Sequence, residues 1–324
     1  MYVMGIDIGG TKVEVALLQV PRLTKDPGGL EIKQRQRVPT KRLDGYPVFF
    51  HNLKDLCLKV LEEAQLSWSE IAWLGLGLPG SVDPKSQVML VGNSVFLQDK
   101  DIVGDLRNAF SLELPIFVAN DANCFIWSEV LCGAGNNYGK SEDSTFSEVS
   151  AIGIILGTGV GGGHVWQGKI HSGTRGAACE FGHIVLEPNG YPCYCGQRGC
   201  AEQYLSGPAI EAAYATRIYG HLSERPSCEE IFALQQKGDP IAIAIIHNYR
   251  RYLAKFLALL VQCFDPTYFV LGGGVSSRKE IYDDIISETQ RRCFLKLQVP
   301  PVLQASLGVS SGVVGAALLG FQEK

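Results

Sequence analysis

The residues of this sequence that could do chemistry begin with a short glycine-rich segment, DIGGTK, which runs from Asp7 to Lys12. Glycines such as Gly9 and Gly10 let backbone N–H groups in a tight turn approach an anion closely. Thr11 adds a hydroxyl, Lys12 adds a cation, and Asp7 adds a carboxylate that can hold Mg²⁺ or its waters. This combination suits a nucleotide polyphosphate. The simpler alternative is an ordinary hairpin turn.

A second glycine cluster, Gly157–Gly163, formally contains the pattern G-x-G-x-x-G. A dinucleotide site of that type requires a helix to begin at the glycines, whereas residues 164–170 are typical of a strand. We therefore expect a second phosphate-binding hairpin, formed by Gly157, Thr158 and Gly159. A nicotinamide oxidoreductase remains the weaker alternative. A third cluster, Gly272, Gly273 and Gly274, follows a strand and either flanks an adenosine or simply ends that strand.

A carboxylate and an amide follow the apolar run at residues 116–119, in the order Asn120-Asp121. A carboxylate at the carboxyl end of a strand, near phosphate-binding loops, is well placed to act as a general base toward a hydroxyl. The alternative is that Asn120 or Asp121 caps a helix, which is a common role for both residue types. The two roles are compatible if each residue takes one of them.

The most specific local pattern is a cluster of three cysteines with a histidine ten residues before it. Its members are His183, Cys193, Cys195 and Cys200. Three thiolates and an imidazole form a closed tetrahedral site that suits structural Zn²⁺. The alternative is a set of buried free thiols. Glu180 and Glu202 lie on either side of the cluster and could bind a polyol, although glutamates are usually solvated surface charges.

Composition excludes several classes of protein. The chain has 324 residues, 46% of them apolar and 19% charged, with a formal net charge of −4. These values predict about two globular domains and argue against a bulk nucleic-acid binder. We find no apolar run long enough to cross a membrane and no secretory signal in the opening residues. We therefore expect a cytoplasmic protein whose ten cysteines are reduced.

Apolar periodicity predicts the elements that position these residues. Strands are expected at residues 3–8, 13–20, 31–38, 71–78 and 116–119, and helices at 239–263, 281–293 and 311–321. The polar stretch at 136–148 is expected to be a surface connection. A strand, glycine turn and strand occur both at the start of the chain and around Gly157, which indicates two related α/β halves.

Taken together, these motifs resemble those of the ROK family of sugar kinases and sugar-responsive repressors. The matching pieces are DIGGTK (7–12), LPG (78–80), ANDAN (119–123), LGTGVGGG (156–163), EFGH (180–183), CYCGQRGCAEQYLSG (193–207), LGGG (271–274) and GAA (315–317). They are spread in the family's order over essentially the whole chain. The cysteine–glycine cluster together with EFGH is the most specific of them.

The resemblance implies an actin-like (ribonuclease H-like) α/β fold of two domains with a cleft between them. A small domain, residues 1–119, would be completed by a C-terminal helix at about 306–324, and residues 120–305 would form the large domain with a zinc-binding loop. The phosphate and adenosine contacts would come from Asp7, Gly9, Gly10, Thr11, Lys12, Gly157, Thr158, Gly159, Gly272, Gly273 and Gly274. The sugar contacts would come from Gly80, Asn93, Asn120, Asp121, Glu180, His183 and Glu202. Zinc would be held by His183, Cys193, Cys195 and Cys200.

The function that the resemblance implies is phosphorylation of a hexose at its 6-hydroxyl by ATP and Mg²⁺, with Asp121 as the general base. We expect a glucokinase- or fructokinase-type hexokinase that forms a homodimer. The alternatives are an N-acetylglucosamine or N-acetylmannosamine kinase and a non-catalytic sugar sensor. A DNA-binding repressor is disfavoured because the phosphate motif begins at residue 7. Cys179 stands where members often carry glycine, so a positive φ there would strain the backbone.

Overall fold

The structure is a computed structural model, and it describes residues 1–21, 29–83, 85–91, 94–136, 138, 148–219, 225–294 and 297–322. The chain forms two compact units. Unit 1 comprises Met1–Glu148, Gly163–Cys179 and Ser306–Lys324, and unit 2 comprises Val149–Gly162 and Glu180–Ala305. The expected boundary after residue 119 differs from this division, because the following helix packs against the C-terminal helix within unit 1.

Unit 1 is built on a five-stranded sheet with the order β3-β2-β1-β4-β7. The strands are β1 (Tyr2–Ile8), β2 (Lys12–Gln19), β3 (Glu31–Pro39), β4 (Ile71–Leu78) and β7 (Ile116–Asn120). β1, β2 and β3 pair in antiparallel fashion, whereas β1–β4 and β4–β7 are parallel. A small hairpin of β5 (Ser81–Val82) and β6 (Met89–Val91) follows β4.

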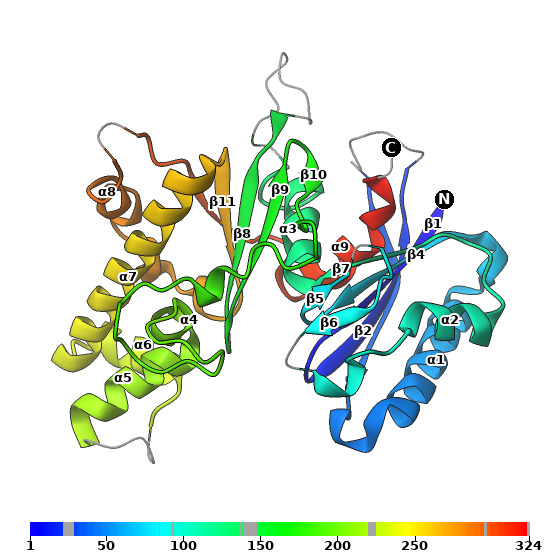
Figure 1. Ribbon diagram of the computed structural model, residues 1–324, viewed down its shortest axis with the longest axis horizontal. Coiled ribbons are helices and arrows are strands. Elements are labelled where there is room, and N and C mark those ends of the chain that lie inside the picture. Colours follow the sequence, from blue (N-terminus) through cyan, green and yellow to red (C-terminus); the bar gives the residue numbers. More distant parts are fainter. Residues whose placement is uncertain are drawn as a thin grey trace. The chain divides into compact units, whose positions relative to one another are not determined.

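The helices of unit 1 are α1 (Gly45–Ala64), α2 (Ile102–Phe110), α3 (Asp121–Leu131) and α9 (Ser311–Ala317). α1 lies along the sheet (Figure 1). The buried side chains of its apolar face, which include Phe49 and Leu53, belong to the same hydrophobic core as the buried side chains of the sheet. α9 lies against β1, β4 and α3. Gly5 and Gly75 allow this approach, because a Cβ at either position would collide with the backbone of α9.

A second five-stranded sheet has the order β10-β9-β8-β11-β12. Its strands are β8 (Ala151–Leu156), β9 (Val160–Trp166), β10 (Lys169–Ile170), β11 (Tyr268–Gly272) and β12 (Val302–Gln304). The β8–β11 and β11–β12 pairs are parallel, as are the corresponding pairs of the first sheet. The two sheets therefore share one strand order, in keeping with the two related halves expected from the sequence.

The helices of unit 2 are α4 (Glu202–Leu205), α5 (Gly207–Tyr219), α6 (Cys228–Gln236), α7 (Pro240–Phe264) and α8 (Ile285–Gln290). α7 is the longest of these, and it packs against α5, α6 and α8 (Figure 1). The side chain of Asp239 accepts a hydrogen bond from Ala242 N at 2.7 Å, and Pro240 occupies the first turn. The sequence predicted this helix, including its cap.

Two predicted helices are shorter in the structure. Instead of one helix over residues 281–293, the chain forms a 3₁₀ turn at Lys279–Ile281 and then α8. The reason is Asp284, which adopts a left-handed conformation with φ of 55° and interrupts the helical path. The predicted helix at 311–321 ends at Ala317 and continues as a 3₁₀ turn, Leu319–Phe321. Most of the polar stretch at 136–148 lies outside the described residues.

Among the helices of the described ranges, none combines the length and the apolar character needed to span a membrane.

Candidate active site

The DIGGTK segment forms the hairpin turn between β1 and β2. Gly9 N donates a hydrogen bond to Lys12 O at 2.8 Å, and Thr40 closes the turn from outside by donating its hydroxyl to Gly9 O at 2.7 Å. Thr11 and Lys12 are exposed at the tip. The turn is thus an ordinary hairpin in its backbone, and it presents a hydroxyl and a cation to solvent as a phosphate-binding loop requires.

The predicted polar residues of unit 1 gather at one edge of its sheet. β1, β4 and β7 are parallel neighbours, with Asp7 paired to Gly77 and Leu78 paired to Asn120. The carboxyl ends of these three strands therefore meet at the same edge, where ligands of open α/β sheets commonly bind. Gly80 joins this edge because its carbonyl accepts a hydrogen bond from Asn120 Nδ2 at 3.1 Å.

Of Asn120 and Asp121, Asn120 is the residue that caps the helix. Asn120 is the N-cap of α3, and its Oδ1 accepts from Ala122 N at 2.9 Å and from Asn123 N at 3.3 Å. Asp121 is the first helical residue and is half-buried, and its Oδ1 accepts from Ala122 N at 2.8 Å. The cap fixes the start of the helix and with it the position of the Asp121 carboxylate.

Asp7 is the most strongly perturbed carboxyl group at this edge. Burial and the negative charges of Asp121 and Glu14, partly opposed by the positive charge of Arg37, together raise the pKa of Asp7 from 3.8 to about 7. The Asp7 carboxylate also lies against α9, since a Cβ at Gly312 would collide with it. A perturbed carboxyl group at a strand end is typical of a functional site.

In unit 2, the Gly157–Gly159 loop joins β8 to β9, and no helix begins there. A strand in this position excludes the helix that a dinucleotide-binding G-x-G-x-x-G loop needs. The loop is closed by a hydrogen bond from Gly157 N to Gly159 O at 3.0 Å, and Thr158 is exposed at its tip. Glu202, which sequence patterns placed near the sugar, accepts a hydrogen bond from Val160 N at 3.0 Å and so supports the loop.

The third glycine cluster lies at the same edge of the second sheet. β11 pairs in parallel with β8, with Gly272 opposite Ile155, so its carboxyl end lies beside the Gly157–Gly159 loop. Gly273 has a φ of 84°, and a Cβ there would collide with the Leu156 backbone. Gly274 is exposed and has open space around it. These features allow a flat group to lie against the backbone.

The cysteine cluster and the histidine come together as the sequence predicted. One ligand atom from each residue lies within 4.8 Å of every other, and the residues are His183, Cys193, Cys195 and Cys200. Cys193 Sγ lies 3.6 Å from His183 Nδ1, and Cys195 Sγ lies 3.6 Å from Cys200 Sγ. Four soft or borderline donors at this separation fit one tetrahedral Zn²⁺.

The surroundings act on the thiols in opposite directions. A hydrogen bond from the backbone N–H of Gln197 lowers the pKa of Cys195. Burial and the neighbouring thiols Cys193 and Cys195 raise the pKa of Cys200. The loop is tied to α7 by Lys255, whose Nζ donates to Leu186 O and lies 2.8 Å from Glu187 Oε1.

The remaining predicted residues are less constrained. Glu180 is exposed and begins the 3₁₀ turn Phe181–His183. Asn93 lies outside the described residues. Cys179 has a φ of 69°, which confirms the suspected left-handed conformation. Two further residues of interest were not predicted from the sequence. Tyr194 lies between two cysteines of the cluster, and Glu14 is a charged residue within the otherwise apolar strand β2.

The sequence matches the ROK family over residues 3–323. It is 32% identical to the N-acetyl-D-glucosamine kinase of Haemophilus influenzae (strain 86-028NP), over 97% of this chain and 98% of that one. It is 33% identical to an N-acetylgalactosamine kinase of Shewanella sp. (strain ANA-3), over 98% and 96% of the two chains. The crystal structure of a ROK hexokinase from Thermus thermophilus superimposes with a TM-score of 0.81 and 30% identity, over 100% and 99% of the chains.

Proposed function

Because the chain belongs to the ROK family and has the actin-like two-domain fold of its sugar kinases, we propose that it phosphorylates an N-acetylhexosamine at the 6-hydroxyl with ATP. Its family and its relatives identify the chain as an ATP-dependent sugar kinase. The whole-length similarity to two N-acetylhexosamine kinases supports an N-acetylhexosamine as the substrate. The glucokinase- or fructokinase-type function expected from sequence motifs lacks this support.

In the proposed reaction, Asp121 accepts the proton of the sugar hydroxyl as its oxygen attacks the γ-phosphorus of ATP. The cap by Asn120 and the hydrogen bond from Ala122 N hold the carboxylate in place. Phosphoryl transfer has a loose transition state, so catalysis depends mainly on position and charge. A well-placed base contributes about 10²–10⁴-fold to the rate.

The phosphates of ATP would be bound by two hairpins with exposed hydroxyls, one at Gly9–Lys12 and the other at Gly157–Gly159. Asp7 would hold the Mg²⁺ that accompanies ATP, directly or through water. Gly273 and Gly274 would flank the adenosine. Glu180, His183 and Glu202 would bind the sugar, together with Gly80, Asn93 and Asn120. The bond from Val160 N to Glu202 links the sugar and phosphate sites within unit 2.

We propose that the Cys₃His cluster binds structural Zn²⁺, which would supply a fixed crosslink for the loop and no open coordination position. The cluster spans residues 183–200, on the same loop as Glu180 and Glu202. Removal of the metal should therefore disorder the sugar-binding residues. A homodimer remains an expectation of the family resemblance.

The test is ADP release with MgATP and zinc-replete protein across N-acetylglucosamine, N-acetylgalactosamine, N-acetylmannosamine, glucose and fructose. The proposal expects the highest kcat/KM for an N-acetylhexosamine. The Asp121→Asn variant should lose about 10²–10⁴-fold in kcat while it remains folded. Asp99→Asn, which changes an exposed carboxylate in the same unit, is the matched control. Near-normal turnover in Asp121→Asn would mean that another group is the base.

A second candidate is a glucose-type hexokinase, which the 30% identity to the Thermus thermophilus ROK hexokinase favours. The same assay separates the two candidates. A kcat/KM for glucose above that of every N-acetylated sugar would replace the first proposal with the second.

A further inference from the structure

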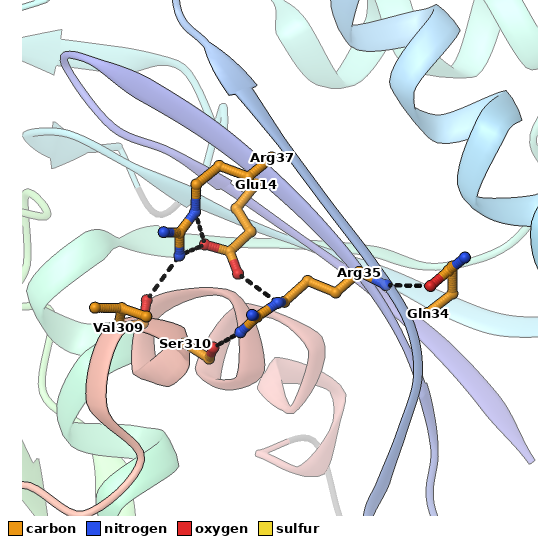
Figure 2. Close-up of polar contacts among 6 residues, drawn as sticks. All are labelled: Glu14, Gln34, Arg35, Arg37, Val309 and Ser310. Atoms are coloured by element: carbon orange, nitrogen blue, oxygen red, sulfur yellow. Dashed lines mark hydrogen bonds and ion pairs between the residues drawn. The ribbon is translucent and has the colours of Figure 1, made fainter.

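Glu14 is a buried carboxylate in unit 1 that the proposed reaction does not use. Glu14 is only 4% exposed. Two arginines of the edge strand β3 pair with it, as Figure 2 shows. Arg37 donates from both Nε, at 2.7 Å, and Nη2 to Glu14 Oε2, and Arg35 Nε lies 3.5 Å from Oε1. Glu14 is buried whereas both arginine side chains are partly exposed, so the cost of desolvating the Glu14 carboxylate offsets part of its attraction to them.

The ion pair lies in one row with Asp7 across three strands. Asp7 of β1 is the register partner of Glu14 on β2, and Glu14 is the register partner of Arg37 on β3. Directly opposed residues on neighbouring strands have Cβ atoms about 4.5–5.5 Å apart. The carboxylates of Asp7 and Glu14 are therefore close enough to repel each other, and Arg37 lies on the far side of Glu14 to offset that repulsion.

The same arginines also hold the segment that covers Asp7. Arg37 Nη2 donates to Val309 O at 3.3 Å, and Arg35 Nη1 donates to Ser310 Oγ. Val309 and Ser310 form the turn that leads directly into α9 (Figure 2). Two residues further on, Gly312 lies against the Asp7 carboxylate, with no space left for a Cβ. The arginines therefore contact two groups that adjoin Asp7, namely the carboxylate of Glu14 and the start of α9.

We propose that Arg35 and Arg37 are positioning residues of the kinase reaction, which act through Glu14 and the start of α9 to hold Asp7 and to balance the charge beside the first phosphate-binding hairpin. When Asp7 and Glu14 are both ionised, their two negative charges balance the two positive charges of Arg35 and Arg37. Loss of one arginine leaves a net negative charge there, which disfavours MgATP. Loss of the Glu14 charge leaves a net positive charge, which favours it. This inference rests on the proposed role of Asp7 at the nucleotide phosphates.

The test measures the Kd for MgATP by calorimetry in the absence of sugar, together with kcat and the KM for MgATP. At the effective dielectric constant of a protein surface, a change of one unit charge beside the phosphate-binding hairpin should change the affinity for MgATP about three- to tenfold. We therefore expect Arg37→Gln to raise the Kd and Glu14→Gln to lower it, with the double variant close to wild type. Arg37→Lys keeps the charge and should restore most of the affinity. If Arg37→Gln does not fold, Arg35→Gln replaces it in the test, because the Arg35 side chain is more exposed than that of Arg37.

Lys33→Gln is the matched control, because Lys33 is a cation on the same strand that pairs with the exposed Glu31. If the ion pair is purely structural, Glu14→Gln and Arg37→Gln should both lower the stability of the protein. The Kd for MgATP should then change in the same direction in both variants, or by no more than it does in Lys33→Gln. Either result overturns the proposal. Failure of the proposed function is distinguishable, since the wild-type protein would then lack sugar-dependent ADP release before any variant is compared.

Discussion

The hydroxyl of Tyr194 lies 3.1 Å from Nε2 of His183, so the other ring nitrogen, Nδ1, faces the thiol cluster. The two rings meet edge to face, with centroids 5.3 Å apart. A partner of this kind fixes the orientation of a histidine that binds a metal through its other nitrogen.

We therefore expect Tyr194→Phe to weaken zinc binding by about 10–100-fold, the usual effect of losing such a partner. Competition with a chromogenic chelator measures this affinity directly. Tyr191→Phe is the control, because Tyr191 is an exposed tyrosine of the same loop whose ring packs on Tyr204 instead. Equal zinc affinity in Tyr194→Phe and wild type would show that the hydroxyl does not orient the histidine.

Cys179 should be a point of backbone strain. Its φ of 69° lies in the left-handed region, where a side chain costs about 1–2 kcal/mol and glycine costs nothing sterically. Cys179→Gly is expected to raise the free energy of unfolding by about 0.5–1 kcal/mol, after the greater entropy of glycine in the unfolded chain is subtracted. Cys179→Ala keeps the Cβ and should give no such gain in denaturant unfolding. A gain in both variants would assign the effect to the thiol.

The ionised carboxylate of Asp7 should lower the free energy of unfolding at neutral and alkaline pH. Burial raises its pKa from 3.8 to about 7, so the folded state binds this proton more tightly than the unfolded state does. The free energy of unfolding should therefore fall as pH rises between about 4 and 7 because of this group. Asp7→Asn should be more stable than wild type at pH 8 but not at pH 4, when unfolding is measured without nucleotide.

The same Asp7→Asn variant should lose MgATP-dependent turnover. Asp44→Asn, an exposed carboxylate of unit 1, is the control for both measurements. A variant whose stability relative to wild type is the same at pH 4 and pH 8 would argue against a raised pKa for Asp7.

Asn120 should have separable structural and binding roles. Asn120→Ala removes the cap of α3 and should lower the free energy of unfolding by about 0.5–2 kcal/mol. Asn120→Ser keeps a capping oxygen but loses the bond from Nδ2 to Gly80 O, so it should recover most of the stability. If Asn120 also contacts the sugar, as proposed, Asn120→Ser should still raise the KM for the sugar. An unchanged KM would leave Asn120 with the cap alone.

The sequence predicted those elements in which one local signal dominates. β1 and β4 are apolar runs, and α7 has both an apolar stripe and a capping Asp-Pro pair. α8 was predicted too long because the left-handed Asp284 carries no distinctive sequence signal. The shorter helices α2, α5 and α6 were not identified, since their amphipathic patterns are brief and their positions depend on tertiary packing.

In the candidate site, too, the features set by local sequence were predicted, and those set by tertiary structure were not. The Cys₃His cluster was predicted because its ligands are close in sequence, and the hairpin at DIGGTK because its turn is local. Sequence could not decide whether Asn120 or Asp121 is the cap, because both residue types serve. Nor could it place Glu14 between Asp7 and Arg37, because strand register is fixed only when the sheet assembles.

The packing of α9 on β1 has a consequence for synthesis on the ribosome. Gly5 and Gly75 fit closely against α9, which is translated more than two hundred residues after them. At about 5–20 residues per second, the remaining chain takes on the order of tens of seconds to appear. Throughout that time one face of the first sheet lacks its covering helix. A nascent chain of this protein should therefore be a client for chaperones that shield exposed strands, until α9 has been synthesised.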